Sequence, residues 1–245
     1  MTNNMKKNNI TKILFLSFLL QGCTINGFYE GYSSDAPDDL LKYNDKKFLG
    51  IPFLLAFEGS SVKLNNQWRA TVAHNRPLLV GQEVYYHPRC DFALIKIADE
   101  GDYPEVGFAS YDKNVFHVGY PIFGIGSSHK GEARGDVINT TDNCMYSATD
   151  GTVISGMSGG GVFNESGQLV GVTTGVMFKN LEWPDGKTEL FPGIFMPLAG
   201  VEDFIYEVTG LDFYPDFETV SNPLTTSEKL AIRKELGKEI RTAKK

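Results

Sequence analysis

The segment Gly156-Met157-Ser158-Gly159-Gly160-Gly161 sets one serine among glycines, directly before the apolar segment Gln168–Thr174. Glycine adopts positive φ values readily and allows a backbone to approach a ligand closely. The Ser158 hydroxyl and the N–H groups of Gly156 and Ser158 can therefore converge on one carbonyl group, an arrangement that suits acyl transfer. Glycine-rich turns between strands are common, so this interpretation depends on partners elsewhere in the chain.

Two upstream segments offer the partners that a nucleophilic serine requires. A serine hydroxyl becomes a good nucleophile when a histidine accepts its proton, and that histidine needs a carboxylate to fix its tautomer. The segment Thr71–His74 ends in a histidine, and Asp91 opens the strand-like segment Asp91–Ile97. His74 and Asp91 are therefore the candidate base and its orienting carboxylate.

Three patterns in this chain resemble, in their order, the motifs of the trypsin- and chymotrypsin-like serine proteases. They are Thr-x-Ala-His, Asp-x-Ala-Leu-x-Lys and Gly-x-Ser-Gly-Gly. The resemblance covers about residues 48–210 and is closest to the bacterial glutamyl-endopeptidase and high-temperature-requirement branches, through Val118–Pro121 and Val162–Gly171. It implies an all-β fold of two packed six-stranded antiparallel barrels, about 46–128 and 129–212, with the site in the cleft between them. Apolar residues at helical spacing in Val201–Val208 predict the closing helix of such proteases.

The resemblance also implies a mechanism of peptide-bond hydrolysis through an acyl-enzyme. Ser158 is the expected nucleophile, His74 the base and then the acid, and Asp91 the residue that orients His74. The Gly156 and Ser158 N–H groups are the expected oxyanion hole. The partner of such an enzyme is a polypeptide substrate.

Two departures from the family pattern keep a second function open. Arg69 and Ala70 stand where the family has two apolar residues, and Asp91 follows His74 by only 17 positions. The alternative is a catalytically silent protease fold that serves as a binding module on the cell envelope. An α/β-hydrolase, whose nucleophile elbow also reads Gly-x-Ser-x-Gly, is excluded because its histidine follows the serine, whereas all four histidines here precede Ser158.

By the same resemblance, the pocket for the side chain before the cleaved bond is lined by two short segments. No acidic residue stands in either segment, so a bound Lys or Arg would be unpaired. Glutamyl endopeptidases have a histidine at the position of Thr173, so their preference for glutamate does not carry over. We expect small or medium uncharged side chains in this pocket, whose residues are Thr152, Val153, Ile154, Ser155, Thr173, Thr174 and Gly175.

The composition predicts a packed globular protein without a nucleic-acid partner. The chain has 245 residues, of which 42% are hydrophobic and 12% aromatic. The net charge of −7 is uneven: residues 1–23 carry +3 and residues 227–245 carry +4, which leaves −14 between them. Phosphate repels such an acidic body. No metal cluster, dinucleotide fingerprint or phosphate loop is present in the sequence, so no cofactor or metal is expected.

The other histidines, His87, His117 and His129, lie outside any motif. We interpret them as structural or solvated residues, with His87 as the best substitute for His74.

Residues 1–22 resemble a bacterial lipoprotein signal peptide. Lys6 and Lys7 precede an apolar core at 13–20 that is too short to span a bilayer, and Gly22 stands before Cys23. We expect cleavage before Cys23 and a lipid (palmitate) anchor on that cysteine, which would place the protein on the cell envelope, in the outer membrane, facing the periplasm or the surface. A plain secretory signal cut elsewhere is the alternative.

The remaining segments complete the predicted organisation. Residues 23–45 are expected to form a tether, and residues 213–245 a tail with a basic helix that begins at the capping box Thr225–Glu228. With Cys23 lipidated, Cys90 and Cys144 are an even pair in an oxidising compartment. A disulfide between them and two free buried thiols are both compatible with the sequence.

Overall fold

The computed structural model describes residues 35, 40–51, 55–122, 124–139, 142–183 and 185–213. The predicted signal peptide, Cys23 and the predicted tail helix lie outside these residues. Among the described helices, none has the length and apolar character needed to cross a membrane. The described fold is mostly β, which confirms the predicted fold class.

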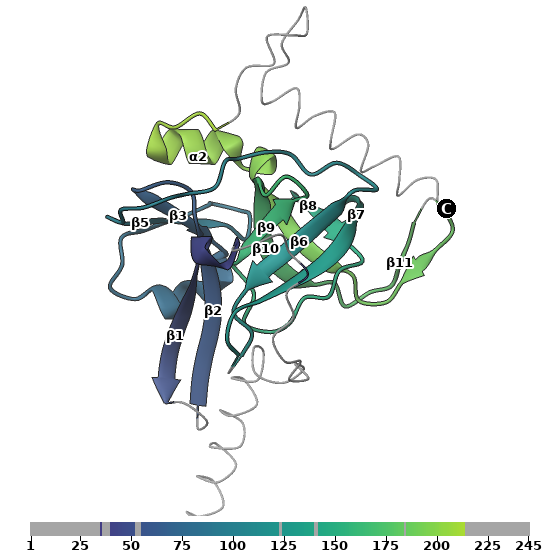
Figure 1. Cartoon of the computed structure of the whole chain (residues 1–245), viewed down its shortest axis with the longest axis horizontal. Coiled ribbons are helices and arrows are strands. Elements are labelled where there is room, and N and C mark those ends of the chain that lie inside the picture. Colours follow the sequence, from purple (N-terminus) through teal and green to yellow (C-terminus); the bar gives the residue numbers. More distant parts are fainter. Residues whose placement is uncertain are drawn as a thin grey trace, which may run out of the picture.

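The N-terminal half is a five-stranded antiparallel sheet with the strand order β1-β2-β3-β5-β4. The long strands β1 and β2 form a hairpin that projects from the body (Figure 1). Before and between the strands lie two 3-10 helices, η2 and η3. The elements are η2 (Leu40–Tyr43), β1 (Asn44–Ile51), β2 (Leu55–Lys63), β3 (Trp68–Thr71), η3 (Ala73–Leu79), β4 (Val84–Tyr86) and β5 (Ala93–Lys96).

This sheet differs from the six-stranded barrel that the resemblance implied for the N-terminal half. The cause is the short connection between His74 and Asp91. Helix η3 occupies the first part of that connection, and only the three-residue strand β4 fits in the rest. Within the described residues the sheet therefore stays open along β4.

The C-terminal half forms a closed six-stranded barrel with the strand order β10-β13-β8-β7-β6-β9. A short hairpin of β11 and β12 projects from this barrel, away from the N-terminal sheet (Figure 1). The strands are β6 (Asn114–Gly119), β7 (Ser127–Asn139), β8 (Cys144–Thr149), β9 (Gly161–Asn164), β10 (Leu169–Val176), β11 (Leu181–Glu182), β12 (Thr188–Glu189) and β13 (Gly193–Pro197).

Two predicted boundaries require correction. Strand β6 pairs with β7 and β9 of the closed barrel, so the halves divide within residues 97–113 rather than at 128. The fold also begins before residue 46, because Leu40 is buried in the core and Asn44 receives a hydrogen bond of 2.8 Å from the Gly161 N–H. The last residues of the expected tether are thus part of the packed domain.

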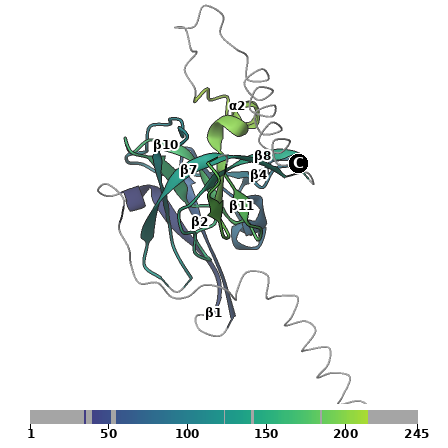
Figure 2. The same cartoon turned by 90° about the vertical axis from the view of Figure 1, so that its right-hand side faces the viewer.

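The predicted closing helix is present as α2 (Glu202–Thr209), which follows the 3-10 turn η4 (Leu198–Gly200). It lies across one end of the strands in both views (Figures 1 and 2). Ile205 enters the core that both halves share, and the Phe204 ring lies 5.0 Å from the His87 ring and 6.2 Å from the Phe92 ring. Helix α2 therefore packs against the loop that carries Asp91.

Arg69, the charged residue at an expected apolar position, is buried in an ion network. Its guanidinium lies 2.9 Å from the Asp99 carboxylate and 3.3 Å from that of Asp45. Lys63 lies 3.4 Å from the same Asp99. The contact with Arg69, followed by that with Lys63, lowers the pKa of Asp99. Because Arg69 has carboxylate partners, the fold accommodates the departure at β3 without an unpaired charge.

Candidate active site

His74 and Asp91 meet because β3 and β5 are paired. Thr71 lies opposite Ala93 in that ladder, so the start of η3, after β3, lies beside the end of the loop that precedes β5. The His74 Nδ1 lies 2.7 Å from Asp91 Oδ2, and the His74 backbone N–H donates to Asp91 Oδ1 at 2.9 Å. A carboxylate on Nδ1 selects the tautomer that leaves Nε2 as an acceptor. The His74 side chain is 40% exposed, so part of the ring is open to solvent.

Ser158 lies in the loop before β9 and is attached to the N-terminal half next to His74. Its carbonyl oxygen accepts hydrogen bonds from the Asn75 Nδ2 at 2.9 Å and from the Ser60 N–H at 2.8 Å. Its hydroxyl donates to the Thr174 carbonyl at 3.0 Å. In this structure the hydroxyl is therefore engaged with β10 rather than with His74.

The glycines around Ser158 are required by close backbone approach. Gly156 and Gly159 have φ values of +96° and +91°. A Cβ atom on Gly159 would lie 2.0 Å from the Ser60 carbonyl oxygen, and one on Gly156 would lie 2.6 Å from the Ile122 nitrogen. Real Cβ contacts are never this short, so larger residues do not fit in this loop without displacing backbone.

Two backbone N–H groups remain free in this loop. The Ser155 carbonyl accepts the Ile122 N–H at 2.8 Å. Because C=O and N–H point in opposite directions across a trans peptide, the Gly156 N–H points away from Ile122. Within the described part of the chain, neither the Gly156 N–H nor the Ser158 N–H donates a hydrogen bond. They are free to bind an oxygen atom beside Ser158.

Asn75 is a residue of this site that the sequence did not single out. It is almost fully buried, and its amide nitrogen lies 3.3 Å from the Ser60 carbonyl oxygen, 3.1 Å from the Thr71 hydroxyl and 2.9 Å from the Ser158 carbonyl oxygen. It thus joins η3, the N-terminal sheet and the serine loop. The only signal for this role in the sequence was the position of an asparagine directly after the histidine of the Thr-x-Ala-His motif.

Cys90 and Cys144 form a disulfide, which decides between the two possibilities that the sequence left open. The bridge joins the residue before Asp91 to the start of β8 in the other half. From the same strand, the Tyr146 hydroxyl accepts the Asp91 N–H at 3.4 Å. It donates in turn to Asp142 Oδ2 at 3.0 Å, and burial raises the pKa of Tyr146.

His87 holds the loop that carries Asp91. Its Nδ1 accepts the backbone N–H groups of Cys90 at 2.8 Å and Arg89 at 3.1 Å. Burial, and then the charge of Arg89, lower its pKa, which favours the neutral ring that these two bonds require. Its Nδ1 is thereby occupied, so His87 is placed as a structural residue of the loop.

One expected pocket segment leads directly into the serine loop, and the other is bound to it by a hydrogen bond of 2.8 Å from the Gly159 N–H to the Thr173 carbonyl. Thr152 is exposed, while the segment from Val153 to Ser155 and the pair Thr174 and Gly175 are half-buried. Thr173 is fully buried, and its hydroxyl lies 2.8 Å from His117 Nδ1 inside the barrel. Burial, and then the nearby His129, lower the pKa of His117 to about 3, so this ring is neutral.

Residues 57–172, which include His74, Asp91 and Ser158, match the model of the trypsin-like peptidase domain. No curated protein matches the sequence significantly. A protease from M. tuberculosis, solved in its active form, superimposes with a TM-score of 0.54 at 17% identity, over 83% of this chain and 97% of its own. The chain has the fold of the trypsin-like serine proteases.

Two further structures support the same fold. The HtrA-type protease AlgW, solved with a tripeptide, gives a TM-score of 0.54 at 16% identity over 69% of this chain and 60% of its own. The serine endoprotease from Yersinia pestis gives a TM-score of 0.51 at 15% identity over 71% of this chain and 67% of its own. The chain therefore spans about three fifths of the HtrA-type structure. Among the described residues, no group of three or more His, Cys, Asp or Glu side chains is arranged to hold a metal ion.

Proposed function

We propose that this protein is a serine endopeptidase that uses Ser158, His74 and Asp91. The observation that carries the proposal is the 2.7 Å contact between His74 Nδ1 and Asp91, together with the hydrogen bond by which the next residue, Asn75, holds the Ser158 carbonyl. Ser158 Oγ attacks the carbonyl carbon of the scissile bond while His74 Nε2 takes its proton. The imidazolium then gives that proton to the leaving amine, and an acyl-enzyme remains. Water, deprotonated by His74, hydrolyses the ester and restores Ser158.

The remaining groups stabilise the charges that form in these steps. The Gly156 and Ser158 N–H groups would donate to the tetrahedral oxyanion, an effect of about 3–4 kcal/mol per donor in related chemistry. Asp91 would stabilise the imidazolium through its 2.7 Å contact with Nδ1, and its second oxygen is held by the His74 backbone. This second contact fixes the carboxylate relative to the ring that it orients.

The open edge of β10 provides a place for the substrate backbone. The pairing of β10 with β9 ends at Val172, so no strand of the described fold pairs with Thr174–Val176 on the edge next to Ser158. A peptide that adds to this edge would donate an N–H to the Thr174 carbonyl, which now accepts the Ser158 hydroxyl. Substrate binding would thereby release the hydroxyl to His74 Nε2.

Preference for an uncharged residue before the cleaved bond is part of the proposal. None of the seven expected pocket residues is acidic or basic. A buried charged side chain of the substrate would have no counter-charge there. A peptide-library profile dominated by cuts after Arg, Lys or Glu would contradict this preference.

The test is covalent labelling of the purified protein with a fluorophosphonate, followed by hydrolysis of a peptide library. We expect label on Ser158, and a loss of hydrolysis by several orders of magnitude in Ser158→Ala, His74→Ala and Asp91→Asn. Because the three residues act as a unit, their losses should not add. Ser166→Ala, which removes an exposed serine, is the matched control. If Ser158 stays unlabelled and wild type cleaves no faster than Ser158→Ala, the silent binding module is correct instead.

We also propose that the mature protein begins at a lipidated Cys23 on the cell envelope. The support is the sequence of residues 1–23, together with the Cys90–Cys144 disulfide, since such bonds persist in oxidising compartments. Mass spectrometry of the mature N-terminus tests this proposal. An unlipidated N-terminus at another residue would contradict it.

A further inference from the structure

A cavity of about 770 Å³ opens beside the candidate site. Apart from Asp91, its lining comes from the C-terminal half, from β7, β8, β10 and β13 and from the segment that contains β11, which projects from the barrel in Figure 1. Asp91 and Thr174, which both belong to the candidate site, are among the residues that line it. The cavity is therefore continuous with the open edge of β10, where the substrate backbone is proposed to bind.

The surface of the cavity is mainly apolar. Trp183 is buried at 7% exposure, whereas Phe178 at the rim is 76% exposed. Exposed apolar side chains around a concave apolar surface are typical of sites that cover a ligand. The apolar residues of this lining are Val137, Ile138, Met177, Phe178, Leu181, Trp183 and Ile194.

Two buried polar atoms of the lining lack partners among the described residues. They are the Trp183 Nε1 and the Thr174 Oγ1. A buried indole N–H without an acceptor is costly, and buried tryptophan normally satisfies it. A ligand with an apolar body and an oxygen acceptor would satisfy this atom.

The charges of the cavity disfavour acidic ligands. Four carboxylates line it, those of Asp91, Asp136, Asp142 and Glu182. Of the two cations, Arg134 is already held by Asp150 at 3.0 Å and Glu132 at 3.1 Å, which leaves Lys179 at the rim. An aspartate or glutamate side chain would enter a site with excess negative charge.

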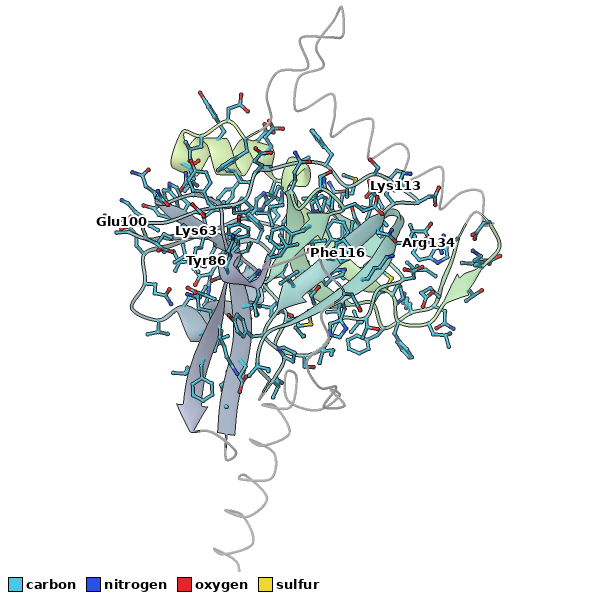
Figure 3. The ribbon with its side chains drawn as sticks, viewed as in Figure 1. Lys63, Tyr86, Glu100, Lys113, Phe116 and Arg134 are labelled. Atoms are coloured by element: carbon cyan, nitrogen blue, oxygen red, sulfur yellow. A yellow bond between two sulfur atoms is a disulfide. The ribbon has the colours of Figure 1, made fainter. Side chains whose placement is uncertain are left out.

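The segment that carries Trp183 is held in place. The Trp183 backbone N–H donates to the Lys187 carbonyl at 2.8 Å, and the Trp183 carbonyl accepts the Gly186 N–H at 2.9 Å. Arg134, labelled in Figure 3 on the side of the barrel that faces this hairpin, lies 4.0 Å from Asp185 near the turn. These contacts hold the turn that carries Trp183, which favours a cavity whose Trp183 side is already formed before a ligand binds.

We infer that this cavity binds large apolar side chains of the substrate, from the residues that precede the one at the cleaved bond, and that Trp183 sets this preference. The inference rests on the proposed peptidase function. It follows from the continuity of the cavity with the β10 edge, from its apolar lining and from its excess of carboxylates. Phe, Leu and Tyr are favoured at these substrate positions, with the Tyr hydroxyl able to accept the Trp183 N–H, and Asp and Glu are excluded.

The experiment uses the full chain and a peptide library with alanine fixed before the cleaved bond and the three preceding positions varied. Wild type should favour Phe, Leu or Tyr and reject Asp and Glu at one or more of these positions. Trp183→Ala should lower kcat/KM for the best apolar peptide about 10-fold or more and change it less than about 3-fold for an all-alanine peptide. Trp183→Phe should keep the preference for Phe and Leu and lose that for Tyr.

Two further variants make the result interpretable. Phe178→Ala removes an exposed side chain and should fold normally, yet it should weaken the apolar preference. Tyr206→Ala removes an exposed aromatic residue of α2 and should change nothing. If Ser158 takes the fluorophosphonate label but the library shows no apolar preference, or Phe178→Ala and Trp183→Phe keep the full wild-type profile, this inference is wrong while the proposed function stands. If Ser158 takes no label, both are wrong.

Discussion

Replacing Asn75 by alanine removes the side chain that joins the His74 helix to the serine loop. The amide nitrogen has two N–H groups for its three acceptors, so about two hydrogen bonds are lost. At about 1 kcal/mol net for each, and with a small cavity left at an almost fully buried position, the free energy of unfolding should fall by about 2–4 kcal/mol. Urea denaturation measures this loss.

The effect of Asn75→Ala on catalysis should be smaller than that of a triad variant. The Ser158 carbonyl keeps its hydrogen bond from the Ser60 N–H, so the loop stays attached while the distance from Ser158 to His74 becomes less defined. Misplacement of a catalytic group by about 1 Å costs about 100-fold. We therefore expect kcat to fall by about 10–100-fold, with little change in KM, in a peptide assay at saturating substrate.

A matched control is Asn66→Ala, which removes an exposed asparagine of the turn before β3. It should leave both stability and kcat unchanged within about twofold. If Asn75→Ala loses 2–4 kcal/mol of stability but keeps the wild-type kcat, the residue only stabilises the fold and the reasoning about the site is wrong. If stability is also unchanged, the three contacts contribute nothing.

Three other predictions follow from the described contacts. Cys90→Ser/Cys144→Ser opens a loop with a sequence separation of 54, so urea denaturation should show a loss of up to about 4 kcal/mol, and unchanged stability would contradict this. His117 has a pKa of about 3 in the fold, against an ordinary value of 6.5, so below pH 6.5 the unfolded chain binds a proton that the folded chain does not. From pH 7.5 to 5, the free energy of unfolding of wild type should therefore fall by about 2 kcal/mol more than that of His117→Gln. Equal losses in the two proteins would refute this prediction. Met157, directly before Ser158, is fully buried and uncharged. It cannot form the ion pair with a newly cut N-terminus that an aspartate at this position forms in trypsin-like zymogens. The uncleaved chain should therefore be active, and a protein that stays inactive until it is cleaved near residues 45–48 would contradict this.

The sequence predicted those features that depend on local pattern. The motifs, through the family they resemble, predicted a mostly β chain, and the apolar spacing of Val201–Val208 predicted α2, which is present at Glu202–Thr209. The motif order predicted that His74 and Asp91 meet, and the β3–β5 register brings them to 2.7 Å. Glycines at 156 and 159 were expected to allow close approach, and both have positive φ.

The sequence did not predict features that depend on which distant segments pack together. Nothing local indicates that Leu40 enters the core, or that β6 pairs into the second half rather than the first. Arg69 looked like a departure from the family because its partners, Asp45 and Asp99, are 24 and 30 positions away. A buried cation is recognisable only when its carboxylates are known.

Asp91 lies where the two halves of the molecule are fastened together. The disulfide at the preceding residue and the Tyr146 hydroxyl both reach it from β8, while His87 holds the loop and carries the Phe204 contact to α2. On the opposite side of His74, Asn75 fastens the serine loop to the N-terminal sheet. The proposed peptidase would need its base, fixed by one half, to stay aligned with a nucleophile from the other. The short His74–Asp91 connection leaves too little chain to enclose the site with loops. The contacts between the halves, which are the disulfide and the Tyr146 and Asn75 hydrogen bonds, can maintain the alignment instead of such loops.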